Sequence, residues 1–123
     1  VIVPVPLHPY RLWRRRYNQA SELARRLGAM SGKPVDPLLL TRKRPTPSQG
    51  AMPSAKARRR NVQGAFAVRP GAAVKGSSVL LIDDVMTTGA TVSACARALK
   101  RAGASQVDVL ALARVVRPLT ATL

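Results

Sequence analysis

Two carboxylates stand side by side in a chain that has very few. Asp83 and Asp84 follow a run of four apolar residues, 79–82, and are two of only five acids among 123 residues. A short stretch rich in Thr and Gly comes next and ends at Thr91. Adjacent carboxylates suit sugar hydroxyls or a hydrated Mg²⁺, while hydroxyls and a glycine backbone suit a phosphate. The pattern predicts a binding site for a sugar phosphate.

A strand and a helix must position this motif. The apolar run 79–82 is typical of a central strand that is buried on both faces. A helix is expected after Gly89, because Val92, Cys95, Ala96 and Leu99 fall on one helical face. In open α/β sheets, ligands bind outside the carboxyl ends of the strands. A helix N-terminus offers backbone N–H groups and a partial positive charge to a phosphate. Cys95 is expected to lie in the core.

The rest of the chain predicts an α/β fold with a mostly parallel central sheet flanked by helices. A first helix is expected from Asn18, as its cap, to Gly28 or Gly32. We expect a single domain over 1–123, with a mobile basic loop at 42–61 that holds seven basic residues and no acid. Further strands are expected in four places: 1–6, 37–41, 62–68 and 107–116.

Composition excludes several classes of protein. With 46% hydrophobic residues the chain is not a disordered basic tail, although its formal net charge is +16. A lone cysteine excludes a disulfide framework and a cysteine zinc site within these residues. No apolar run is long enough for a transmembrane helix, and no signal peptide is visible. We therefore expect a cytoplasmic protein without membrane contact.

Other motifs also place acids after an apolar run. A Walker B strand requires GxxxxGK[ST] upstream, but Ser77 stands where the Lys is needed after Gly71 to Gly76. A receiver domain requires a later phosphoacceptor Asp, yet only Asp108 remains after the pair. A dinucleotide fold requires GxGxxG, which is absent. The structural alternative is an acid pair that merely caps a strand end.

The stretch 79–91, VLLIDDVMTTGAT, resembles the phosphoribosyl-pyrophosphate (PRPP) motif of type I phosphoribosyltransferases at all thirteen positions. The resemblance extends over nearly the whole chain to the ComF branch, a competence-protein family that is amidophosphoribosyltransferase-like. The opening stretch 3–9 is similar to that branch's first strand and pyrophosphate loop. Residues 18–20 resemble its first helix start, and 42–66 its loop signature. The implied fold is the type I phosphoribosyltransferase fold.

This resemblance implies a role for each part of the motif. Asp83 and Asp84 would be the catalytic pair and hold the ribose hydroxyls, with Mg²⁺ carried by the substrate and in contact with one of them. The 5′-phosphate would lie against Thr87, Thr88, Gly89, Ala90 and Thr91. The pyrophosphate and flexible-loop residues would be Leu7, His8, Arg11, Arg42, Arg44, Gln49 and Arg58.

Three departures from the family pattern stand out. Arg16 replaces an expected Gly, and Ala57 replaces a common acid before the loop arginine. The chain also lacks the N-terminal four-cysteine zinc ribbon of many ComF-branch proteins, so we interpret it as a truncated domain or a short variant.

The resemblance implies a Mg²⁺-dependent transfer of a phosphoribosyl group from PRPP, with release of pyrophosphate. The alternative is a non-catalytic competence protein that binds single-stranded DNA through its basic N-terminal half, with PRPP or a nucleotide as effector. The +16 charge motivates this alternative, because phosphate neutralisation dominates nucleic-acid affinity. A coding bias toward Arg or a polyanionic substrate also accounts for the charge. The acceptor and a homodimer are left open.

Overall fold

A central parallel sheet organises the chain. The computed structural model describes residues 1–6, 18–43, 64–86 and 89–114. Strand β4 (Ser78–Met86) lies between β1 (Ile2–Pro4) and β5 (Gln106–Arg114) and is parallel to both. Because a parallel pair needs a crossover, helix α4 (Ala90–Arg101) connects β4 to β5. The predicted parallel α/β architecture is confirmed.

A second, smaller sheet was not predicted. Strands β2 (Leu40–Arg42) and β3 (Phe66–Val68) pair antiparallel with each other. A two-stranded pair needs packing against another element for stability, and β3 packs against α4. A bidentate ion pair between Asp36 and Arg69, at 2.9 and 3.0 Å, joins the segment before β2 to the residue that follows β3.

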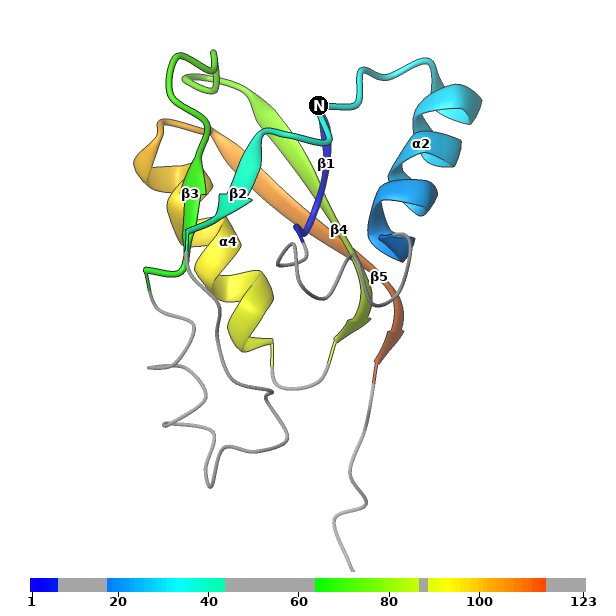
Figure 1. Ribbon diagram of the computed structural model, residues 1–123. Coiled ribbons are helices and arrows are strands. Elements are labelled where there is room, and N and C mark those ends of the chain that lie inside the picture. The colour runs from blue at the N-terminus through cyan, green and yellow to red at the C-terminus, as the bar shows by residue number, and fades with distance from the viewer. Residues whose placement is uncertain (7–17, 44–63, 87–88, 115–123) are drawn as a thin grey trace, which may run out of the picture.

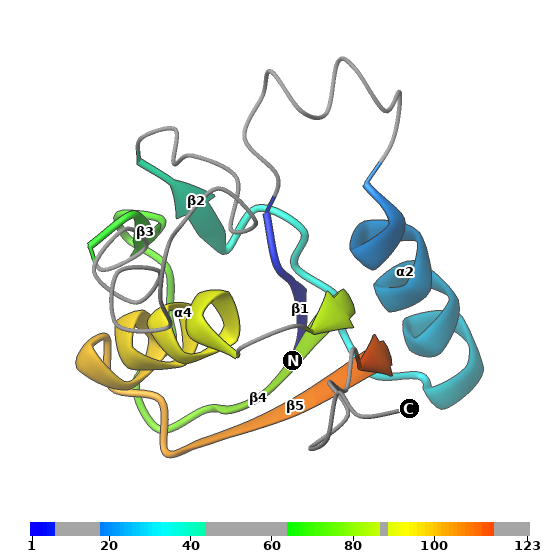
Figure 2. The same ribbon diagram turned by 90° about the horizontal axis from the view of Figure 1, so that it is seen from below.

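Helix α2 (Gln19–Ser31) covers one face of the central sheet, and α4 with the small sheet covers the other (Figure 2). The helix begins as predicted at Asn18, whose side chain accepts a hydrogen bond from the Ala20 N–H at 3.0 Å. It ends at Gly32, where φ is 73°. Gly28 therefore lies inside the helix rather than at its end.

The core consists of two clusters separated by the sheet. The cluster on the α2 side includes Ile2, Ala24 and Ile82. The larger cluster on the α4 side includes Leu81, Leu99 and the fully buried Cys95, so the predicted core position of this cysteine is confirmed. Within the described ranges, no helix is long and apolar enough to cross a membrane.

The observed strands differ from the predicted ones in their bounds. β4 continues past Ile82 to Met86, and β5 spans Gln106–Arg114, with positions 115 and 116 of the predicted strand outside the described residues. The strand predicted at 37–41 begins later, at Leu40, and the one predicted at 62–68 begins at Phe66. The mobile loop predicted at 42–61 lies almost wholly outside the described residues, which stop at 43 and resume at 64.

Candidate functional site

The carboxyl ends of the three parallel strands meet at one end of the molecule. Both helices also begin at that end (Figure 1). Asp83 and Asp84 lie here on β4, the central strand. They belong to the strand itself, not to a loop after it, because Asp83 and Val85 keep their register with Ala111 and Ala113 of β5. In α/β proteins, ligands bind at this end of the sheet, outside the carboxyl ends of the strands.

The two aspartates are held by the backbone that follows them. Oδ1 of Asp83 accepts a hydrogen bond from the Asp84 N–H at 2.9 Å, and Oδ1 of Asp84 accepts one from the Val85 N–H at 2.8 Å. The sequence folds this way locally because a carboxylate can bond to a backbone amide close to it in the chain. Both carboxyl groups are thereby oriented before any ligand arrives.

Asp83 is the one buried charged residue among those described, with 8% of its surface exposed. Burial first, and then the neighbouring Asp84 carboxyl, together raise the pKa of its carboxyl to about 6. Removal from water disfavours the charged form, and a second carboxylate repels it. The pair is poised to take up a hydroxyl donor or a cation, either of which favours the ionised form.

Arg42 approaches this pair from the small sheet. It ends β2, and its guanidinium carbon lies 4.8 Å from the centroid of the Phe66 ring, in a cation–π contact. Its positive charge lowers the pKa of Asp83, against the larger effects of burial and of Asp84, and also acts on Cys95. Sequence reasoning assigned Arg42 to the pyrophosphate. The sequence did not indicate that Arg42 lies near Phe66 and Asp83, because these residues come together only through tertiary packing.

Helix α4 begins at Ala90, six residues after Asp84, at the same end of the sheet (Figure 1). Gly89 is its N-cap with φ 80°, and a side chain added there would meet nothing within 4 Å. Its carbonyl accepts the first helical bond, from the Ser93 N–H at 2.8 Å. Ala90 is buried and Thr91 half-buried. The first turn has no acidic residue, so the helix dipole and its N–H groups favour an anion at this position.

The end of β1 joins the same region. The Val5 N–H donates to the carbonyl of Ile82 at 2.8 Å, immediately before the aspartates. The Asn18 side chain donates to the carbonyl of Val5 at 3.1 Å. Asn18 thus ties the start of α2 to the end of β1, a role beyond the predicted cap. The sequence indicated only that Asn18, an asparagine before a helical pattern, could cap the helix. It did not indicate the hydrogen bond to Val5.

Several predicted site residues lie outside the described part of the chain. The structure places Asp83, Asp84 and the start of α4 at Gly89 at the same end of the central sheet, and the charge of Arg42 acts on Asp83. The predicted residues that fall outside are Leu7, His8, Arg11, Arg44, Gln49, Arg58, Thr87 and Thr88.

The donor chemistry of the acid pair fits Mg²⁺, which prefers carboxylate oxygens and keeps several waters or substrate oxygens. Within the described ranges, no group of three or more His, Cys, Asp or Glu side chains is placed to hold a metal ion. Asp83 and Asp84 would hold such an ion only together with oxygens from a substrate or water.

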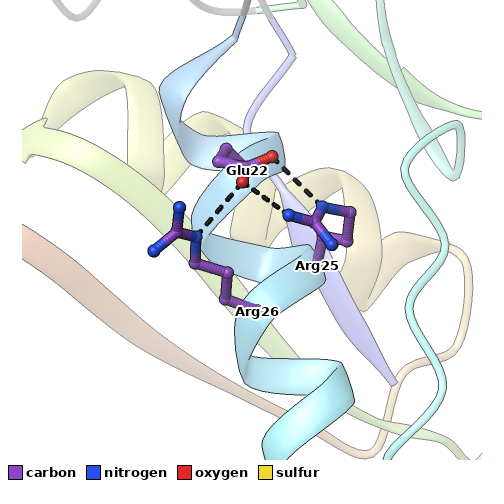
Figure 3. A network of polar contacts seen from close by, with 3 residues as sticks. All are labelled: Glu22, Arg25 and Arg26. Carbon is purple, nitrogen blue, oxygen red and sulfur yellow. Dashed lines mark hydrogen bonds and ion pairs between the residues drawn. The ribbon is translucent and has the colours of Figure 1, made fainter.

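The acids outside the site are engaged differently. Glu22 accepts hydrogen bonds from Arg25, at 2.6 and 3.1 Å, and from Arg26 at 3.1 Å (Figure 3). These bonds lower the pKa of the Glu22 carboxyl to about 2. Asp36 holds Arg69 bidentately, which also lowers the pKa of Asp36. Asp83 instead faces another acid, an arrangement that costs stability.

Comparison with known proteins settles the family. The model of the phosphoribosyl transferase domain matches residues 17–118. The chain belongs to the phosphoribosyl transferase domain family. It is 41% identical over 115 residues to the DNA utilization protein YhgH of Salmonella typhi, which covers 94% of this chain and 49% of that protein. The type I phosphoribosyltransferase fold that the motif predicted is confirmed.

The chain is also similar to two further proteins. Competence protein F of Haemophilus influenzae is 38% identical over 118 residues, which cover 92% of this chain and 49% of that protein. Adenine phosphoribosyltransferase of Clavibacter michiganensis is 51% identical over 41 residues, which cover 33% of this chain and 23% of that enzyme. The chain therefore spans about half the length of the curated competence-type relatives that it matches.

Proposed function

We propose that this domain binds PRPP at the junction of β4 and α4 and transfers its phosphoribosyl group, in a Mg²⁺-dependent reaction that releases pyrophosphate. One observation carries the proposal. The buried Asp83 and the half-buried Asp84 lie near the carboxyl end of the central parallel strand, and a helix starts at the left-handed Gly89 at the same end of the sheet. Acids beside an anion-favouring helix start match the two ends of a ribose phosphate.

Each part has a distinct task in this proposal. Asp83 and Asp84 accept hydrogen bonds from the ribose hydroxyls and fix the sugar. The amides at the start of α4, with Thr91, bind the 5′-phosphate. The bond between the sugar C1 and pyrophosphate breaks through an oxocarbenium-like state, while the acceptor forms its bond to C1. Such a reaction depends on stabilising charge in a site without water.

Protonation of Asp83 links the site to its ligand. Asp83 has a pKa of about 6 in the free protein, and only the ionised carboxylate accepts hydrogen bonds at both oxygens. The positive charge of Arg42 already favours ionisation. Mg²⁺, when bound with the substrate, would neutralise charge on the leaving pyrophosphate. Its positive charge would also further favour the ionised form of Asp83. The roles of Arg44 and Arg58 toward pyrophosphate stay predictions.

Isothermal titration calorimetry with PRPP and Mg²⁺ tests the proposal. Asp83→Asn and Asp84→Asn should each weaken binding about 10- to 150-fold, because a hydrogen bond to a charged acceptor contributes roughly 1.5–3 kcal/mol. Glu22→Gln is the matched control, since it also turns an acid into an amide but lies on the exposed surface of α2. Equal affinities for the wild type and the Asp83→Asn/Asp84→Asn double variant would refute PRPP binding at this site.

A second candidate function is binding of single-stranded DNA. Two observations favour it: the net charge of +16, and relatives whose names refer to DNA utilization and competence. Exposed basic side chains of the N-terminal half, among them Arg25, Arg26 and Lys33 in the described residues, would contact the phosphates. Affinity for an oligonucleotide should then fall steeply with salt and stay unchanged in the Asp83→Asn/Asp84→Asn variant. The two candidates therefore separate in one set of titrations.

A further inference from the structure

Strand β5 is the outer edge of the central sheet as far as the structure describes it. It is nine residues long and pairs only with β4 among the described strands. A strand in this position presents a row of backbone N–H and C=O groups to whatever lies beside it, and so acts as a template for pairing. Its own sequence carries little that would prevent this, because it contains no proline and no lysine.

The register of β5 defines which of its side chains share a face. Asp108 lies beside Leu80 and Leu110 beside Ile82, and both partners belong to the cluster under α2. Since side chains alternate along a strand, Asp108, Leu110, Leu112 and Arg114 lie on this same face. Leu110 is 41% exposed and Leu112 71%. Helix α2 packs on β1 and β4, and it leaves these two leucines uncovered.

The order of these side chains along β5 would let the strand pair with a second copy of itself. Asp108 and Arg114 stand three residues before and after Ala111, and Leu110 and Leu112 stand one residue before and after it. In an antiparallel pair of two β5 strands centred on Ala111, each Asp108 would face Arg114 of the other copy. Each Leu110 would likewise face Leu112. Opposite charges and apolar pairs directly across two strands stabilise a sheet.

We propose that two copies of this chain associate through β5, paired antiparallel about a two-fold axis at Ala111, to form one continuous sheet. This symmetric contact is closed, because the same surface serves both partners. The pairing also satisfies the outer backbone groups of β5 and covers Leu110 and Leu112. The charge complementarity between Asp108 and Arg114 selects a second copy over an unrelated strand. The inference does not depend on the ligand proposed for the site.

Cross-linking tests the register directly. Ala111→Cys places two thiols opposite each other across the axis, with Cβ atoms about 5 Å apart, close enough for a disulfide after a small adjustment. Ala113→Cys is the matched control on the same strand and face. Its two copies would be offset by four residues, about 13 Å along the strand. The native Cys95 is buried and does not interfere.

The expected result is a disulfide-linked dimer of Ala111→Cys under mild oxidation, at concentrations where Ala113→Cys forms no disulfide link. Equal cross-linking of the two variants, or faster cross-linking of Ala113→Cys, would overturn the proposed register.

Charge exchange tests the partner choice. In sedimentation equilibrium over the micromolar range, Asp108→Arg or Arg114→Asp should each weaken the dimer about tenfold, because two cross-strand pairs become repulsive at once. Combining both changes should restore it. Arg101→Asp, an equal change of charge on the exposed end of α4, should leave the dimer intact. A wild type that is monomeric throughout, or single variants that dimerise normally, would disprove the proposal.

Discussion

At the scale of single residues, Asp83 is unusual because it is an acid buried next to another acid. Burial and Asp84 together raise its pKa from 3.8 to about 6. Between these values the folded chain binds more protons than the unfolded chain, so stability decreases as the pH rises. The native fold therefore gives up stability near neutral pH to keep a carboxylate at this position, a common feature of functional sites.

Asp83→Asn should remove this dependence. Below about pH 4 the variant and the wild type should unfold at similar urea concentrations, since Asp83 is protonated in both folded and unfolded wild type. The variant should become the more stable protein as the pH passes 6, by at most about 3 kcal/mol, the equivalent of a pKa shift of about two. Urea denaturation at pH 4, 5, 6 and 7 measures the difference. If the unfolding free energies of the two proteins differed by the same amount at every pH, the raised pKa of Asp83 would be contradicted.

At the scale of elements, sequence patterns predicted most of what exists but not where each element stops. The helical periodicity after Asn18 and the apolar run before Asp83 correctly identified α2 and β4. The extension of β4 to Met86 was missed, because backbone pairing with β5 maintains it and no local pattern encodes that pairing. The contact of Arg42 with Phe66 was missed for the same reason. Long-range pairing is decided by packing, which a single sequence does not display.

Gly28 shows how an element depends on its neighbour. It lies inside α2, where glycine is normally unfavourable, and an added Cβ would overlap Cγ2 of Val35. Gly28→Ala should therefore destabilise the protein by about 1–3 kcal/mol of overpacking, less a helix-propensity gain of about 1 kcal/mol. The unfolding free energy from urea denaturation measures this.

The control for Gly28 is the same change in a Val35→Ala background. Removing the Val35 methyl groups relieves the closest contact and leaves the new Cβ 3.2 Å from the carbonyl oxygen of Lys33, so Gly28→Ala should there cost much less. A similar loss in both backgrounds would show that Gly28 is retained for another reason.

At the scale of the whole molecule, two electrostatic effects of opposite sign compete. With 21 basic residues and five acids, the compact chain repels itself. Ion pairs oppose this, among them Glu22 with Arg25 and Arg26, and Asp36 with Arg69. Exposed pairs of this kind contribute about 0.2–1 kcal/mol each. Because five acids can pair with only a minority of the basic side chains, repulsion should dominate.

Salt should therefore stabilise this protein. Raising NaCl from about 0.01 to 0.1 M shortens the screening length from about 30 to 10 Å, which weakens repulsion between distant cations more than contacts between paired groups. We expect the thermal midpoint to rise by a few degrees. Arg97→Glu with Arg101→Glu, both on the exposed face of α4, lowers the net charge by four and should reduce that rise. Arg97→Lys with Arg101→Lys keeps the charge and should leave it unchanged. A midpoint that decreases with added salt would mean instead that the ion pairs of Glu22 and Asp36 outweigh the net charge.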